Sequence, residues 1–163
     1  MPLELPHTAG CLVCGPGNAK GLRLHLHVDP HTGIVQTRFA PGLEHIGFQG
    51  MAHGGVVATV FDEAMVWAAS WAGKRFCVCG EMTVRFRRKA PVGHVLIFKA
   101  RVESSRAKLI ATSAEAVDAH GAIIAAATGK YVPIPREEND QFVRTFVSDA
   151  ATAAAAEMMR GES

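Results

Sequence analysis

Apolar and polar residues of this chain alternate in several separate runs, a pattern typical of strands with one buried face. The clearest run spans residues 22–28, where Leu or Val alternates with Arg or His. Residues 29–33 have turn chemistry, and residues 34–40 then predict the returning strand of a hairpin. Later in the chain, short links separate four more alternating runs, which predict an antiparallel meander: 76–89, 94–103, 109–117 and 122–132.

Between the hairpin and the meander, the sequence predicts one long helix from His53 to about Ala72. No proline interrupts this segment, which starts at Gly54-Gly55 and ends at Gly73. The order of two strands, one helix and four strands predicts an α+β fold with a single helix lying on an antiparallel sheet. Because the helix is apolar nearly all round, we expect a partner subunit to cover the side that one curved sheet leaves open.

The length of 163 residues predicts one domain, here residues 1–135 with a Cys-rich lead, followed by a helical tail at residues 136–163. Pro133 and Pro135 end the last strand, and Glu137 to Met159 is expected to be helical.

Composition narrows the classes of partner. A net charge of +2 provides no broad field for nucleic acid or an anionic membrane, and no run of 18 or more uncharged apolar residues predicts a membrane span. Met1, Pro2 and Glu4 open the chain without the features of a secretory signal, so we expect a cytoplasmic protein.

The four cysteines are expected to be reduced thiols or metal ligands rather than a disulfide framework. Cys11 and Cys14 have the spacing of half a structural zinc site, but residues 15–76, a gap of 62 residues, separate them from Cys77 and Cys79. This gap is far from the spacing of zinc ribbons, so we expect no metal.

Two acidic residues, Asp62 and Glu63, interrupt the apolar helix, although burying a carboxylate is costly unless it is paired or hydrogen-bonded. Being adjacent, they diverge by about 100°, and only Asp62 shares a face with Gly55. Glycines at a helix start expose unpaired amides that can hold a carbonyl oxygen, and a carboxylate on the same helix can activate water. The alternative reading is that the glycines permit close packing and the acids form ion pairs or face solvent.

Residues 49–64, Gln-Gly-Met-Ala-His-Gly-Gly through Asp-Glu-Ala, resemble the helix of hotdog-fold thioesterases of the PaaI and 4-hydroxybenzoyl-CoA thioesterase kind. Residues 84–91 resemble that family's strand after the helix, and residues 11–22 are similar to the lead of many PaaI-like members. The resemblance covers about residues 11–132.

The resemblance implies a hotdog fold, in which a sheet wraps the long helix and two subunits join their sheets, with acyl-CoA in a cleft at the subunit interface. It also implies thioester hydrolysis without a cofactor, CoA being part of the substrate. The amide of Gly54, with that of Gly55, would polarise the thioester carbonyl, and Asp62 would be general base or nucleophile. His53 and Gln49 would orient substrate or water, and Glu63 is carried as a further catalytic candidate.

Where related sequences often have Ser or Thr after the helix, this chain has Cys79-Gly80-Glu81. Strict alternation puts Val78 and Gly80 on the helix-facing side, so Cys79 points away unless a bulge at Gly80 shifts the register. Cys79 is therefore a candidate substrate-binding residue. The Asn that some relatives have before the helix is also missing: Gly47 lies near that position, and Gln49 is the candidate substitute.

Basic residues gather at the end of the same strand. Arg85, Arg87 and Arg88 can hold the phosphates of CoA by forked hydrogen bonds, or they can be an edge-protecting charge cluster. The expected function is that of an acyl-CoA thioesterase forming a homodimer or homotetramer. The alternative is a non-catalytic acyl-CoA-binding or regulatory hotdog module, and a hotdog hydratase ranks last.

Overall fold

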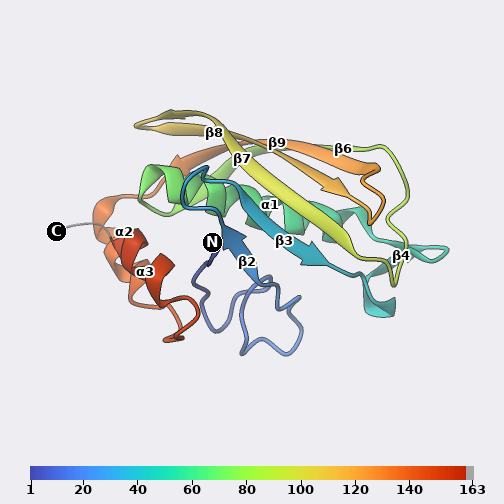
Figure 1. Cartoon of the computed structure of the whole chain (residues 1–163), viewed down its shortest axis with the longest axis horizontal. Helices are drawn as coiled ribbons and strands as arrows, with labels where there is room; N and C mark the ends of the chain where they lie inside the picture. Colours follow the sequence, from blue (N-terminus) through green and yellow to red (C-terminus); the bar gives the residue numbers. More distant parts are fainter. Residues whose placement is uncertain (161–163) are drawn as a thin grey trace.

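The computed structural model describes residues 1–160, so the last three residues of the expected tail lie outside the described part. One antiparallel sheet of seven strands curves around the helix α1 (Gly54–Gly73), as Figure 1 shows. This arrangement is the predicted α+β class. The strands, in spatial order, are β1 (Leu3–Glu4), β2 (Leu26–Val28), β3 (Val35–Phe39), β7 (Leu96–Arg106), β8 (Leu109–Val117), β9 (Ile123–Pro133) and β6 (Cys77–Phe86).

The hairpin and the meander form where the alternation predicts them, with one difference. Of residues 22–28, only Leu26–Val28 pairs in the sheet as β2. The amides of Leu22 and Leu24 donate instead to the carbonyls of Leu12 and Val13. The end of this segment therefore pairs in the sheet, whereas its beginning hydrogen-bonds to the N-terminal lead. These bonds to the lead hold it beside the core.

Helix α1 runs as predicted through the centre of the molecule. His53 is its N-cap, and Lys74, in the left-handed conformation with φ of 49°, ends it one residue after Gly73. Phe61 and Met65 are fully buried against the sheet, and the Phe61 ring packs edge-to-face on Phe98 of β7 at a centroid distance of 4.9 Å. An edge-to-face aromatic pair of this kind contributes about 0.5–1.5 kcal/mol beyond the area that it buries.

The chain itself covers more of α1 than the sequence suggested. Trp67 is buried, with its ring 6.0 Å from Phe76 and 6.2 Å from Phe146, measured between ring centroids. On the tryptophan face, therefore, residues of the same chain outside the sheet cover the helix, and no partner subunit is needed there. What stays partly open is a narrower face that carries Gly55, Thr59 and Asp62.

The C-terminal tail is helical, but in two pieces rather than one. Helices α2 (Arg136–Val143) and α3 (Ala153–Arg160) are separated by a turn-rich segment. The break is stabilised by packing on the N-terminal segment, because the Val147 amide donates to the carbonyl of His7 and Thr8 forms a bridge with Phe146. These contacts outweigh the intrinsic preference of the sequence for one continuous helix.

Three small elements precede α1: the short helix η1 (Leu43–His45) and the strands β4 (Ile46–Phe48) and β5 (Met51–Ala52). Gln49 and Gly50, with φ of 41° and 75°, form the tight turn between the two strands. Among residues 1–160, none of the helices combines the length and the apolar character that crossing a bilayer requires.

Candidate active site

The first turn of α1 leaves one backbone amide available. The ring Nδ1 of His53 accepts a hydrogen bond from the Gly55 amide at 2.9 Å, so His53 acts as a cap. The amides of Val56 and Val57 donate to the His53 carbonyl. Within residues 1–160, the Gly54 amide donates no hydrogen bond. Because the Gly55 amide is already committed to His53, Gly54 alone can offer an amide to a carbonyl oxygen, contrary to the expectation that both glycines contribute.

A cavity of about 620 Å³ opens at this end of the helix. His53, Gly54 and Val57 line it from α1, and Phe86 approaches Gly54 so closely that a Cβ there would lie 3.3 Å from the ring. Basic residues complete one wall of this cavity: Arg87, Arg88 and Lys89. The helix start and the positive charges expected to bind phosphate thus share one cavity.

Of the candidate residues, only His53, Gly54, Arg87 and Arg88 line this cavity. Gln49 and Arg85 lie near its two ends in sequence but outside its lining. Gln49 is exposed at the tip of the turn between β4 and β5 and is not part of the cavity lining. Arg85 alternates with Val84 and Phe86 along β6, so its exposed side chain points to the opposite face of the sheet. Neither residue is brought to the Gly54 amide within one chain.

Strand β6 contains a bulge at Gly80, and this bulge decides where Cys79 points. Cys79 pairs with Tyr131 of β9, whereas Glu81 pairs with Lys130, so Gly80 is the extra residue. The strand therefore places Cys77 and Cys79 on the helix side before the bulge, and Met82 and Val84 on that side after it. Val78, which strict alternation assigns to the helix side, is 49% exposed, and that assignment is wrong.

Asp62 meets the sheet at this bulge. The hydroxyl of Tyr131 donates a hydrogen bond to Asp62 Oδ1 at 2.9 Å. Burial, together with the negative charge of Asp62, raises the pKa of Tyr131 above its ordinary value, so the phenol keeps its proton and remains a donor. Partial burial and the same carboxylate also raise the pKa of Cys79, which favours the neutral thiol. A partly buried carboxylate is thereby held in place with a hydroxyl and a thiol beside it.

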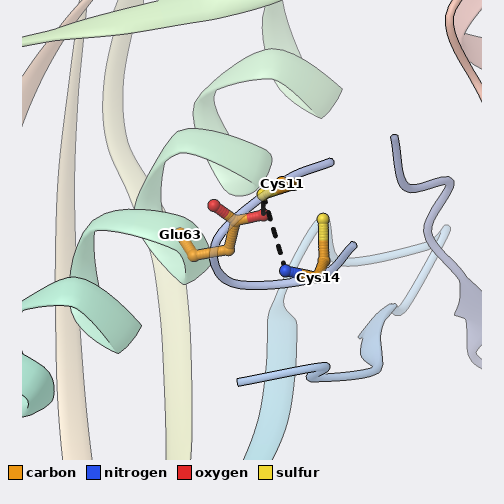
Figure 2. Close-up of side chains that lie close together, drawn as sticks. All are labelled: Cys11, Cys14 and Glu63. Atoms are coloured by element: carbon orange, nitrogen blue, oxygen red, sulfur yellow. Dashed lines mark hydrogen bonds between the residues drawn. The ribbon is translucent and has the colours of Figure 1, made fainter. Parts of the chain in front are cut away.

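Glu63 faces away from Asp62, toward the Cys-rich lead. Its Oε1 accepts a hydrogen bond from Trp67 Nε1 at 3.1 Å. The same oxygen lies 4.0 Å from the sulfur of Cys11, and Figure 2 shows the two side chains facing each other. Burial, reinforced by the charge on Cys11, raises the pKa of Glu63 to about 7. The structure therefore does not bring Glu63 together with the other catalytic candidates.

The carbonyl-binding amide of Gly54 and the carboxylate of Asp62 lie far apart along α1. Gly54 and Asp62 are eight positions apart, which corresponds to roughly 12 Å at the rise of an α-helix. A carbonyl held at the Gly54 amide is consequently too far from Asp62 of the same chain for attack by a water that Asp62 activates, because reacting atoms must lie about 3–3.5 Å apart.

The family comparison agrees with the fold. Residues 49–125 match the family model described as the thioesterase superfamily. With a sheet wrapped around one long helix, this match confirms the resemblance to hotdog-fold thioesterases. The chain has no significant match among curated protein sequences.

Solved structures show the same fold. A thioesterase superfamily protein superimposes with a TM-score of 0.70 at 24% identity, covering 76% of this chain, which spans 60% of that protein's length. The Escherichia coli PaaI protein from the phenylacetic acid degradation operon gives a TM-score of 0.66 at 22% identity, covering 73% of this chain and 85% of PaaI. A hypothetical thioesterase from Streptococcus pneumoniae, solved with coenzyme A, gives a TM-score of 0.59 at 17% identity. The match covers 62% of this chain and 81% of that protein.

Two residues beside the candidate site escape the sequence reasoning. Tyr131 is the only tyrosine of the chain, in a strand otherwise rich in alanine, and that isolation was the one available signal. The closeness of Phe86 to Gly54 depends on how the end of β6 lies against the helix start, which the alternation along the strand does not predict.

Proposed function

We propose that this protein hydrolyses acyl-CoA thioesters to a free acid and CoA, at a site formed by two copies of the chain. The observation that carries the proposal is the Asp62 carboxylate, which lies on an otherwise apolar helix and is held by Tyr131 at 2.9 Å. Burying such a group is costly, and a carboxylate held in place on a partly open face of the helix is suited to activating water.

The need for two subunits follows from the geometry of α1. Because Gly54 and Asp62 are too far apart to act on one carbonyl, Asp62 must serve a thioester held at the Gly54 amide of another subunit. β6 is an edge strand of ten residues, with one side paired to β9 and the other left without a strand partner among residues 1–160. Such an edge favours antiparallel pairing with β6 of a second copy, which would set two α1 helices side by side in opposite directions.

In the proposed reaction, the thioester oxygen accepts a hydrogen bond from the Gly54 amide, where the helix dipole stabilises the developing negative charge. Asp62 removes a proton from water as the water oxygen attacks the carbonyl carbon. The tetrahedral intermediate then collapses and expels CoA as the thiolate. Direct attack by Asp62, through an acyl-enzyme anhydride, is the competing route, and single-turnover hydrolysis in ¹⁸O-labelled water distinguishes the two because only this route labels the enzyme.

Arg87 and Arg88 are proposed to bind the phosphates of CoA, since both line the cavity at the helix start. Neighbours of the same fold have been solved with CoA or acetyl-CoA, which supports this class of ligand. His53 is proposed to act by fixing the helix start, and a cytoplasmic homodimer or homotetramer is the proposed form of the protein.

The proposal is tested by measuring CoA release from a panel of aliphatic and aromatic acyl-CoAs. Asp62→Asn should lower kcat by about 10²–10⁴-fold, the usual effect of removing a general base. Asp140→Asn, at an exposed position on α2, is the matched control and should keep full activity. Circular dichroism checks that both variants are folded. Wild-type protein that binds CoA saturably but hydrolyses none of the panel would overturn the proposal and favour the non-catalytic module.

A further inference from the structure

A second cluster of reactive groups lies on the face of α1 that carries Glu63, and the proposed hydrolysis does not use it. Cys11 and Cys14 from the lead and Glu63 from α1 place their ligand atoms within 4.8 Å of one another (Figure 2). Cys14 is buried, and Cys11 and Glu63 are partly buried. Thiols and a carboxylate this close together at a partly buried site can be ionised at the same time only if a positive charge compensates them.

The turn that carries the two cysteines is already shaped to hold a thiolate. The backbone amides of Val13 and Cys14 point at the sulfur of Cys11, at 3.4 and 3.5 Å. Gly15 makes this turn possible, because a Cβ at that position would lie 2.5 Å from both the nitrogen and the oxygen of the Cys11 backbone.

Glu63 is also oriented toward the cysteines. Trp67 Nε1 donates to Oε1 of Glu63, which fixes the carboxylate on the side of the lead. A hydrogen bond of this kind is typical of groups that hold a metal ligand in place. The lead itself is fixed, because the amides of Leu22 and Leu24 donate to the carbonyls of Leu12 and Val13, which lie between the two cysteines.

We propose that Cys11, Cys14 and Glu63 form a zinc site that fastens the N-terminal lead to helix α1. Two thiolates and one carboxylate suit Zn²⁺, which takes Zn–S bonds of about 2.3 Å and Zn–O bonds of about 2.0–2.2 Å. Those bond lengths imply separations of roughly 3.5–3.8 Å between ligand atoms in a tetrahedral site, so the cluster needs to contract by only about 1 Å. Water is the expected fourth ligand.

This site differs from the expectation based on cysteine spacing. A zinc ribbon needs a second cysteine pair, and Cys77 and Cys79 are too far along the sequence to supply it. In the structure the third ligand is a carboxylate, brought to the lead by the position of Glu63 on α1. The proposal concerns a structural ion and does not depend on hydrolysis.

The test uses the full chain, purified with reductant, stripped with chelator and then loaded with Zn²⁺ alone. Elemental mass spectrometry should find one zinc per chain in the wild type and little in Cys11→Ser, Cys14→Ser and Glu63→Gln. Cys79→Ser and Glu81→Gln, which alter exposed residues elsewhere, are the matched controls and should keep one zinc. Co²⁺ in place of zinc should give thiolate charge-transfer and tetrahedral visible bands that Cys11→Ser abolishes. These spectra need no substrate, so the outcome is independent of the hydrolysis test.

Three results would overturn the proposal. The first is wild-type protein that takes up no zinc after reduction. This result counts against the site whether or not peptide mass spectra show a Cys11–Cys14 disulfide before the reductant is added. The second is equal zinc uptake by Cys11→Ser and the wild type. The third is full uptake by Glu63→Gln, which removes Glu63 as a ligand. Thermal unfolding gives a further check, because zinc should raise the Tm of the wild type and leave that of Cys14→Ser unchanged.

Discussion

Asp62 and Glu63 are consecutive residues of one helix, yet they belong to two different sites. Asp62 points to the bulge between β6 and β9, where Tyr131 holds it. Glu63 points to the N-terminal lead, where Trp67 and Cys11 meet it. The groups around Glu63 all come from one chain, whereas Asp62 lacks a carbonyl-binding amide within reach. Under the two proposals, this helix carries a site shared between subunits on one face and a site complete within one chain on the next face, about 100° away.

The strongest test of the Asp62 side is the substitution Gly54→Pro. Gly54 is the first residue of α1, a position where proline is well tolerated, and His53 already has the extended conformation that proline requires before it. The substitution removes the free amide and keeps the helix, so kcat should fall by about 10²–10³-fold, as for the loss of one oxyanion donor. Gly54→Ala, which adds a Cβ toward Phe86 but keeps the amide, should lose much less.

The same variant tests whether the Asp62 site needs a second subunit and the Glu63 site does not. Mixed and refolded, Gly54→Pro and Asp62→Asn subunits should recover about a quarter of wild-type activity, because half the dimers are mixed and each of these holds one intact site. Mixing Cys11→Ser with Glu63→Gln should restore no zinc binding, because those ligands belong to one chain. No recovery in the first mixture would place Asp62 and its substrate within a single subunit.

A smaller effect is expected from removing the donor that holds each carboxylate. Tyr131→Phe should lower kcat by about 10- to 100-fold, the equivalent of one hydrogen bond to a charged group. Trp67→Phe should leave kcat nearly unchanged and lower the free energy of unfolding by about 1–3 kcal/mol, because Glu63 loses its donor. Steady-state kinetics and urea unfolding of both variants measure the contrast. Equal effects on kcat would mean that the two sides of α1 are not independent.

The sequence predicts the long helix and the meander well because their periodicities are repeated over many residues, and periodicity follows directly from which face is buried. It does not predict the side of β6 on which Cys79 lies, because one extra residue at Gly80 reverses the alternation. Nor does it predict that Tyr131 meets Asp62, since 69 positions separate them and only the folded sheet joins them. The single tail helix fails for the same reason: contacts with His7 and Thr8 near the N-terminus favour the break.

The smallest predicted effect concerns His53, at the start of the helix that both sites share. Its Nδ1 accepts the hydrogen bond of the Gly55 amide, so His53→Ala should lower the free energy of unfolding by about 0.5–2 kcal/mol, as expected for the loss of an N-cap. His53→Asn keeps a side-chain acceptor at the cap and should restore most of that stability. If capping is the whole contribution of His53, His53→Asn also restores kcat. If His53→Asn has wild-type stability but a low kcat, the imidazole ring itself contacts substrate or water. The start of α1 would then take part in the reaction at the Asp62 site.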